Sequence, residues 1–542
     1  MGSRARLSGI TLAELERALR PATVVFLGVP VLIFALGWLR PIVAIAAAAA
    51  TIVALVPLAR SGARAERDSD GKAARVSPLA LLAGLAPAAT LVFVSGAGGF
   101  GPRTWDWFKH DAILKDLVVQ PWPVLYATEA GTTGLVYYVA YLLPAAVAGA
   151  VAGWKVANLA ILATSLAGTT LAVLWLVVLA RGAPLVCGAM LALFSGMDVL
   201  GGALLSGGGG LAEVLSNYHL ENWAKHWQYS GTPSLLYFVP NQAIAGWLLA
   251  ALLVDAVRRG RTGFPFAALP AVGLLWSPFV ALGLLPLALA GACARSQRLV
   301  AVVREQANPA NLAAVLLGLL LTAYFAARVG PLALPDRYHP AAAAPANGAF
   351  WLVPLRVPLA DFTVRYLLFV LCEFVLLWLL AMRAQPDGEG ARPMQRLLLA
   401  AGVTLLLLPL FHYGLYNDLV MRASIPALFV VQIAALQALR RGARSVTTVL
   451  IAAVLAIGAI YPANLLRWHV RWMAGSRDIV SVRPMASVRS LFHLQLDDAV
   501  ARRQEFVTQY LGAADAPFYR YLARRSRPAD VTTPDPQGGD RR

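Results

Sequence analysis

The sequence predicts an all-α polytopic membrane protein. Of its 542 residues, 59% are hydrophobic and 14% are charged, whereas a soluble domain is roughly half apolar and about a quarter charged. Apolar runs of about 17–25 residues recur from Thr23 to Ala463, and about 20 residues cross the hydrocarbon core of a bilayer. The formal net charge of +18 bears first on topology, because basic loops between such runs face the cytoplasm.

We expect about 13 transmembrane helices, ordered by the positive-inside rule. The basic loops assigned to the cytoplasm are residues 4–20, 60–75, 258–261, 295–304, 383–396 and 440–444. The spans are expected near residues 22–39, 41–59, 78–96, 156–180, 184–199, 237–256, 263–278, 280–293, 310–328, 362–382, 396–411, 424–439 and 447–463. The first apolar run leads directly into the second, which favours a retained span over a cleaved signal peptide.

The apolar run at residues 135–151 is not counted as a crossing, because counting it would place the basic loop 258–261 outside. We expect residues 132–154 to form a re-entrant or interfacial helix on the outer leaflet. Pro144, Gly149 and Gly153 suit such a short, broken element.

This topology divides the chain into two regions. Residues 1–463 form the transmembrane domain, whose outer loops are residues 97–155, 201–236, 330–361 and 412–423. Residues 464–542 form an extracytoplasmic tail, with amphipathic helices expected within 486–511 and disorder from about residue 525. All seven histidines lie on the outer side or at its edge: His110, His219, His226, His339, His412, His469 and His493.

The first outer loop contains a dense charged segment, Trp105 to Leu117, with helical spacing. Its apolar residues Trp107, Ile113, Leu114 and Leu117 are expected to face lipid, and its polar residues Asp106, Lys109, His110 and Asp116 to face water. One interpretation is a plain interfacial helix with solvated charges. The other is a reaction site, in which Asp106 or Asp111 is a general base that a neighbouring cation keeps ionised.

The second outer loop combines charges with aromatic rings between Asn217 and Tyr229. On a helix Glu221 and Lys225 can pair, because they are four residues apart. Trp223 and Trp227 are flat rings that either stack on sugars or belong to an aromatic belt. The same segment carries His226 and Gln228.

Arginines in the later outer loops are candidates for binding a phosphate, since a guanidinium is a planar, permanently charged fork. Arg422, beside Asn417 and Asp418, is the first choice, followed by Arg356 and Arg337. The alternative for each arginine is a pair with a carboxylate or a snorkelling side chain.

Two acids fall within or near the spans. Glu373 either marks an ion path or is a hydrogen-bonded structural acid, and Asp198 lies near an outer helix end. No zinc-type spacing and no Walker loop occurs in the sequence. No cofactor is therefore indicated, although a divalent cation at the outer loops stays open, and no basic-aromatic module suggests a nucleic acid.

This arrangement resembles the GT-C superfamily of membrane glycosyltransferases over roughly residues 78–463. Members have many spans, a large first outer loop with an essential acid, and helices lying along the membrane. The matching parts are the loop with Asp106 and Asp111, the run at residues 136–154, and the outer loops near Arg356 and Arg422. Family members often have adjacent acids, whereas these two are five residues apart, so both stay candidates for the base.

The resemblance implies transfer of a sugar from a polyprenyl-phosphate donor to a glycan, lipid or protein acceptor of the cell envelope, at the outer face of a bacterial inner membrane. It assigns donor phosphate binding to Arg422, Arg356, Arg337, Lys225, His226, Asn417 and Asp418. It assigns acceptor or sugar binding to Lys109, His110, Glu221, Trp223, Trp227 and Gln228. The alternatives are an envelope polysaccharide polymerase or ligase, and a solute or lipid transporter that uses Glu373 and Asp198.

Overall fold

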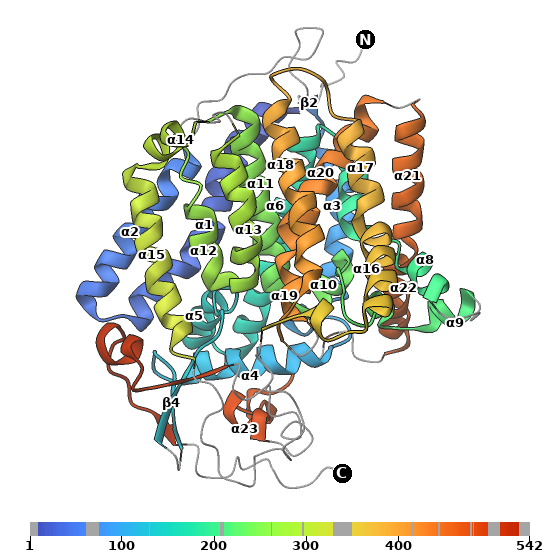
Figure 1. Ribbon diagram of the computed structural model, residues 1–542. Coiled ribbons are helices and arrows are strands. Elements are labelled where there is room, and N and C mark those ends of the chain that lie inside the picture. Colours follow the sequence, from blue (N-terminus) through green and yellow to red (C-terminus); the bar gives the residue numbers. More distant parts are fainter. Residues whose placement is uncertain are drawn as a thin grey trace, which may run out of the picture.

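The computed structural model describes residues 9–60, 75–128, 131–205, 211–261, 263–294, 298–328, 350–414, 417–442, 445–476, 480, 482–496 and 510–530. Within these residues, ten helical segments are long and apolar enough to cross a membrane. The protein is thus an α-helical, multi-pass membrane protein (Figure 1). The ten segments are α1 (Leu12–Trp38), α2 (Pro41–Ala59), α6 (Trp154–Ala180), α7–α8 (Pro184–Leu205), α11 (Pro240–Arg259), α15 (Pro309–Ala326), α16–α17 (Leu359–Arg383), α18 with its terminal turn (Arg392–Leu410), α19–α20 (Asp418–Arg441) and α21–α22 (Val446–Gly475).

The expected count of about 13 spans is not confirmed. Three of the predicted spans fall on helices shorter than the rest: α3 (Pro78–Phe93, 16 residues), α12 (Ala268–Trp276, 9 residues) and α13 (Pro278–Ala292, 15 residues). Prolines begin or interrupt these segments, and a proline cannot supply the backbone N–H that continues a helix. The remaining helices are α4 (Trp105–Val119), α5 (Leu143–Ala152), α9 (Leu211–Ser216), α10 (Thr232–Phe238), α14 (Leu299–Gln306) and α23 (Leu491–Leu496).

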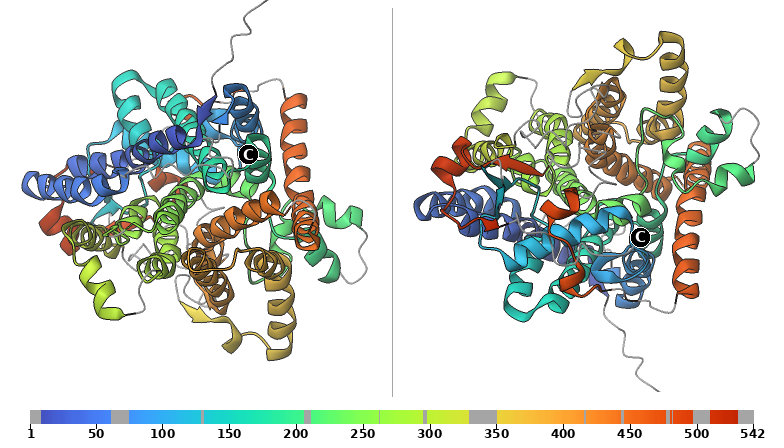
Figure 2. Two further views of the ribbon diagram at one scale, coloured as in Figure 1. Left: turned by 90° about the horizontal axis from the view of Figure 1, so that it is seen from above. Right: turned by 90° about the horizontal axis from the view of Figure 1, so that it is seen from below.

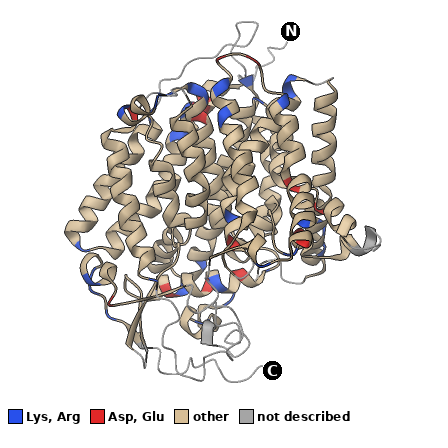
Figure 3. Cartoon of the chain, in the orientation of Figure 1, with Lys and Arg blue, Asp and Glu red and all other residues tan. Residues whose placement is uncertain are grey.

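Lys, Arg, Asp and Glu gather toward the two ends of the helical bundle, and few of them lie in the long middle of the described helices (Figure 3). We call the end that holds the N-terminus the N-terminal face, and the end that holds α4 and α23 the C-terminal face (Figure 1). At the N-terminal face, Arg20 of α1 donates to Asp255 of α11, with Nε to Oδ2 at 2.7 Å and Nη2 to Oδ1 at 2.9 Å. Glu16 joins this network through Arg20 and Arg259. Buried ion pairs thereby connect α1 to α11.

The C-terminal face carries a four-stranded sheet that the sequence did not predict. Its order is β7 (Leu511–Ala513), β4 (Gly131–Leu135), β3 (Leu125–Thr128) and β8 (Ala529–Asp530). Strand β4 runs antiparallel to both β3 and β7, whereas β8 runs parallel to β3. The other strands form two short pairs, β1 (Ile10–Thr11) with β2 (Arg75–Val76) and β5 (Trp351–Leu352) with β6 (Phe411–His412).

The sheet corrects the expected helix at residues 132–154. This segment begins in β4, continues through a buried connection, and becomes helical only in α5, which has 10 residues. A helix of that length is too short to cross a bilayer, in keeping with its exclusion from the count of spans. The first residues are extended because two other strands, one of them from the tail, satisfy their backbone hydrogen bonds.

The tail packs onto the C-terminal face, beside α4 in the view from below (Figure 2). Helix α22 (Ile460–Gly475) continues past residue 463, where the tail was expected to begin. Ala529–Asp530 pairs with β3, so the expectation of disorder from about residue 525 is wrong for residues 525–530. Of the helices expected within residues 486–511, the structure has α23; residues 497–509 and 531–542 lie outside the described residues.

Candidate functional site

Helix α4 lies across the C-terminal face and brings the charged segment of the first outer loop against the bundle (Figure 1). Its start is anchored to two neighbours: Thr104 Oγ1 donates to Tyr237 O at 2.9 Å, and Trp107 Nε1 donates to Ser95 O at 2.7 Å. The turn before it uses Gly96 at φ +91°, where a Cβ atom would come within 2.7 Å of the Trp107 ring. Only glycine suits this position without strain. The predicted helix is therefore present and firmly placed.

The expected division of α4 into a lipid-facing and a water-facing side is wrong. The apolar residues Trp107, Ile113, Leu114 and Leu117 are buried inside the protein, and so are His110, Asp111 and Asp116. The cause is the tail and the strand region, which cover the expected polar side. Asp116 Oδ2 accepts hydrogen bonds from Leu491 N and from Tyr126 Oη, both at 2.8 Å.

Asp111 is held by Arg103 in a two-pronged ion pair with N–O distances of 2.5 and 2.8 Å. Both side chains are buried. Burial raises the pKa of Asp111, and the Arg103 guanidinium only partly offsets that effect. A carboxylate whose two oxygens are taken in this way is suited to fixing the loop before α4, and not to receiving a proton from a substrate.

Asp106 has a different environment. Its Oδ1 lies 2.5 Å from Lys109 Nζ, and its side chain is 26% exposed. Lys109 also lies over the rings of Tyr137 and Tyr510, with its Nζ at 6.0 and 5.7 Å from their centroids. Burial acts to raise the pKa of Asp106, but the Lys109 ammonium and the other neighbouring groups together outweigh it, and the pKa is lowered. Asp106 is therefore an ionised carboxylate with access to the surface.

Helix α19 (Asp418–Ala423) presents a second pair of opposite charges beside the first. Arg422 Nη2 lies 3.6 Å from Asp418 Oδ1, and the buried Arg422 Nε has no partner in the described part of the chain. The Arg422 charge contributes to lowering the pKa of Asp106, and Asp418 lies within electrostatic range of both Lys109 and Asp106. We call Asp106, Lys109, Asp418 and Arg422 the acid–base cluster.

His110 is not a cation in this structure. Its ring is buried, Nε2 lies 3.4 Å from Phe238 O, and Nδ1 has no partner among the described residues. Burial, together with the nearby Lys109 charge, lowers the pKa of His110 to about 3. At neutral pH the ring is uncharged, so it cannot attract a phosphate as a cation would.

The second outer loop does not form the expected helix. Between Asn217 and Tyr229 the chain has one short turn, at Leu220–Asn222, and Lys225 is exposed with φ at +68°. Glu221 and Lys225 form no ion pair within the described part of this segment. Glu221 instead accepts hydrogen bonds from Gln228 Nε2, Gly231 N and Ser234 Oγ at 2.8–2.9 Å. Burial, and next the charge of Asp198, raises the pKa of Glu221 to about 8.

The tryptophans of this loop are core residues. Trp223 Nε1 donates to Glu373 Oε1 at 2.8 Å, and Trp227 Nε1 donates to Pro409 O at 2.6 Å. The Trp227 ring contacts Phe362 and Phe369. Because both indoles are buried, neither has an open face for a sugar.

Three further predicted residues form a separate group on the same side. Asn417, with φ at +60°, donates to His226 O at 3.2 Å and to Phe411 O at 3.1 Å, which fixes the start of α19. Burial lowers the pKa of the His226 ring. Arg356 lies 5.2 Å from the centroid of Trp351, whose ring stacks on His412 at 4.3 Å. Arg337 lies outside the described residues.

The two acids of the spans meet each other. Glu373 lies in a π-helical turn (Leu371–Val375), and Asp198 begins α8 (Asp198–Leu205) after a break in the preceding helix. Their carboxyl groups lie within electrostatic range of each other, and Ser195 Oγ donates to Asp198 Oδ2 at 2.7 Å. Among the described residues, no set of three or more His, Cys, Asp or Glu side chains is placed to hold a metal ion.

Sequence reasoning missed the aromatic walls of the acid–base cluster. The rings of Tyr137 and Tyr138 are tilted against each other with their centroids 3.9 Å apart, and Tyr138 Oη accepts from Gln242 Nε2 at 3.2 Å. The Tyr137-Tyr138 pair inside an otherwise apolar run was a usable signal, whereas nothing in the tail pointed to Tyr510. Comparison of the chain with family models, with curated proteins and with solved structures gives no match.

Proposed function

We propose that the protein is an integral-membrane glycosyltransferase that transfers a sugar from a polyprenyl-phosphate donor to a cell-envelope acceptor. The observation that carries the proposal is the acid–base cluster. Asp106 and Lys109 of α4 form one ion pair and Asp418 and Arg422 of α19 form another, and the two pairs, from distant parts of the chain, lie within electrostatic range of each other at one end of the bundle. A transferase with a lipid-phosphate donor needs a base for the acceptor hydroxyl and cations for the departing phosphate, and the cluster contains both kinds of group.

In the proposed reaction the acceptor hydroxyl gives its proton to Asp106. The acceptor oxygen forms a bond to the anomeric carbon of the sugar, and the bond between that carbon and the phosphate oxygen of the donor breaks. The polyprenyl phosphate leaves with the electron pair of the broken bond, and Asp106 keeps the proton until it passes to solvent. No nucleotide-binding domain is required, because the donor already carries its leaving group.

Lys109 and Arg422 are the proposed cations for the departing phosphate. In the structure each pairs with a carboxylate, Lys109 with Asp106 and Arg422 with Asp418. A phosphate that draws Lys109 away would release Asp106 from its ion pair. The pKa of Asp106 would then rise, which makes it a better base at the moment when the donor is bound. Arg422 Nε, which has no partner in the described residues, is free to contribute a further donor.

The sugar-binding role first expected of Trp223 and Trp227 falls, on this proposal, to three tyrosines: Tyr137, Tyr138 and Tyr510. Their rings surround Lys109, and tyrosine offers a sugar both an apolar ring face and a hydroxyl group. The acceptor on this proposal is a glycan, lipid or protein, and the C-terminal face is the extracytoplasmic side of a bacterial plasma membrane. The same cluster would also serve an envelope polysaccharide polymerase or ligase, which differs only in acceptor.

The direct test is transfer of radiolabelled sugar from polyprenyl-phosphate donors by the purified protein in lipid nanodiscs. We expect D106N to lower kcat by about 10²–10⁴-fold, the usual contribution of a general base, and R422Q to impair transfer as well. D361N is the matched control, because Asp361 is a 45% exposed acid that pairs with Arg365 on the same side. Full activity of D106N would remove the base assignment.

A transporter is the second candidate, favoured by two buried acids, Asp198 and Glu373, that lie within electrostatic range of each other next to a broken helix and a π-helical turn. Such irregular turns with acids often mark ion paths. The variant E373Q distinguishes the two. A transferase with its reaction at α4 keeps sugar transfer in E373Q, whereas a transporter that uses this carboxyl loses proton-coupled or ion-coupled uptake into proteoliposomes.

A further inference from the structure

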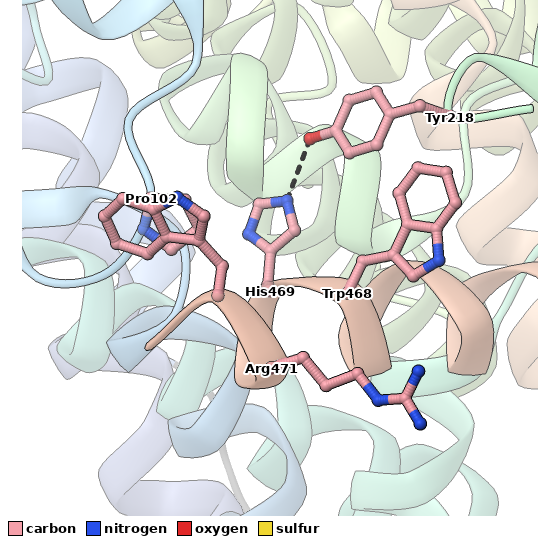
Figure 4. Close-up of a pocket in the computed structure, with 6 residues that line it drawn as sticks. Pro102, Tyr218, Trp468, His469 and Arg471 are labelled. Atoms are coloured by element: carbon pink, nitrogen blue, oxygen red, sulfur yellow. Dashed lines mark hydrogen bonds between the residues drawn. The ribbon is translucent and has the colours of Figure 1, made fainter. Parts of the chain in front are cut away.

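A second site is indicated by a shallow pocket of about 380 Å³ beside α22. It is lined by Pro102, Tyr218, Trp468, His469, Arg471 and Trp472. Figure 4 shows His469 reaching toward Tyr218, with Trp468 alongside and Arg471 on the same helix. None of these residues belongs to the acid–base cluster, so the pocket requires its own explanation.

The walls of the pocket are held in place by hydrogen bonds and stacking. His469 Nδ1 lies 2.9 Å from Val94 O and Nε2 lies 2.8 Å from Tyr218 Oη. Since a carbonyl can only accept, Nδ1 carries the proton and Tyr218 donates to Nε2. The His469 ring stacks on Tyr237 at 3.9 Å, and Tyr218 stacks on Trp468 at 5.4 Å. The pocket is therefore preformed.

The charge at the pocket is positive. The six lining residues include one arginine and no carboxylate. Arg471 is exposed and forms no ion pair with a carboxylate within the described ranges. Arg467, one turn earlier on α22, is also exposed, and its Nη2 donates to Asn464 Oδ1 at 2.9 Å. Two guanidinium groups that have no carboxylate partner among the described residues thus lie on the helix that carries the aromatic rings of the pocket, which favours an anionic ligand.

The position of α22 at the membrane surface indicates which anion the pocket binds. Helix α22 continues the segment that begins with α21, and the most apolar stretch of Val446–Gly475, which lies mainly in α21, is 28% buried, the lowest value of the ten candidate spans. Trp472 is 48% exposed and Val470 is 44% exposed. The segment ends at the C-terminal face, where tryptophan and arginine lie at the level of lipid headgroups. Lipid phosphate is the anion that is present at this level.

We propose that the α22 pocket binds the phosphate headgroup of an anionic phospholipid from the leaflet at the C-terminal face. Arg471 binds the phosphate, with Arg467 adding positive charge, and Trp468 and Trp472 flank the glycerol and the upper acyl chain. This site is separate from the acid–base cluster and does not depend on the proposed transferase activity.

The test uses tryptophan quenching by lipids brominated in their acyl chains, with the full-length protein in phosphatidylcholine nanodiscs. One sample contains about 20 mol% brominated phosphatidylglycerol and the other the same fraction of brominated phosphatidylcholine. The contribution of Trp472 to the quenched fluorescence is the difference between the wild type and W472F. We expect phosphatidylglycerol to quench this contribution at least about twofold more, and R471Q to abolish the excess.

R520Q is the matched control, because it removes another exposed arginine from the C-terminal face and should keep the excess quenching. The proposal is overturned if R471Q retains the excess, or if the two lipids quench Trp472 equally. It is also overturned if about 10 mM inorganic phosphate removes the excess, because the pocket would then take soluble phosphate and not a lipid.

Discussion

Asp106, Asp111 and Asp116 lie on one helix, yet each carboxylate has different neighbours. Asp106 faces a lysine and remains partly exposed, Asp111 is clamped by Arg103, and Asp116 is buried beneath the tail. The residue type sets what each group can do, whereas burial and partners decide what it does. For Asp116 the deciding partner, the backbone N–H of Leu491, comes from the far end of the chain.

Lys109 should control the pH at which the proposed transferase loses activity. Asp106 accepts a proton only when it is ionised, so the rate falls as pH drops through its pKa. Because Lys109 lowers that pKa, K109M should move the acidic limb of the kcat/KM profile to higher pH, by about one unit. Profiles from pH 4 to 9 measure the shift. K115M, on the same helix, is the control, and an unmoved limb in K109M would contradict the role of Lys109.

Asp116 should make the folded protein less stable as pH rises. Burial raises its pKa to about 7, against a usual value of 3.8. Between about pH 4 and 7 the folded state holds a proton that the unfolded state has released, so stability declines over this window. We expect D116N to flatten the decline, since an amide oxygen can accept the same two hydrogen bonds. The Tm of the wild type and of D116N in detergent, at pH 4.5 and 7.5, measures the decline. An equal decline in the wild type and in D116N would contradict the role of Asp116.

At the scale of elements, the predictable features were those that depend on local pattern. The helix expected from Trp105 to Leu117 is α4, and ten of the expected spans coincide with long apolar helices, because hydrophobic length and periodicity are written in neighbouring residues. Strand β4 was mistaken for helix, since its partner β7 lies in the distant tail. The sequence identified Asp106 and Arg422 as separate candidates, but the electrostatic interaction between them depends on the packing of α4 and α19.

The ion network between α1 and α11 should contribute strongly to stability. Arg20 and Asp255 are each 1% exposed, and R20M would leave Asp255 and Glu16 without this partner. Removing one member of a buried pair costs roughly 3–5 kcal/mol, so a clear drop in Tm in detergent is expected. R392Q breaks an exposed pair with Glu389 at 3.4 Å and should change stability by less than about 1 kcal/mol. Equal effects would show that the network is not stabilising.

At the scale of the molecule, the two faces differ in what they present. The N-terminal face has the basic ends of α11 and α20, Arg258 with Arg259 and Arg440 with Arg441. The C-terminal face has the sheet, the tail and the acid–base cluster. Basic ends favour the cytoplasmic side, and the polyprenyl-linked donor of the proposed reaction lies on the opposite side. The proposed activity therefore requires one particular orientation in the membrane.

That orientation can be measured by labelling single cysteines with a membrane-impermeant maleimide. Cys187, Cys293 and Cys372 are first replaced by alanine, after which R520C reports the C-terminal face and R392C reports the N-terminal face; both arginines are exposed. We expect R520C to be labelled in intact cells and R392C only after permeabilisation. The reverse pattern would place Asp106 and Arg422 on the cytoplasmic side, where an acceptor outside the membrane could not reach them, and the transferase proposal would fail on geometry alone.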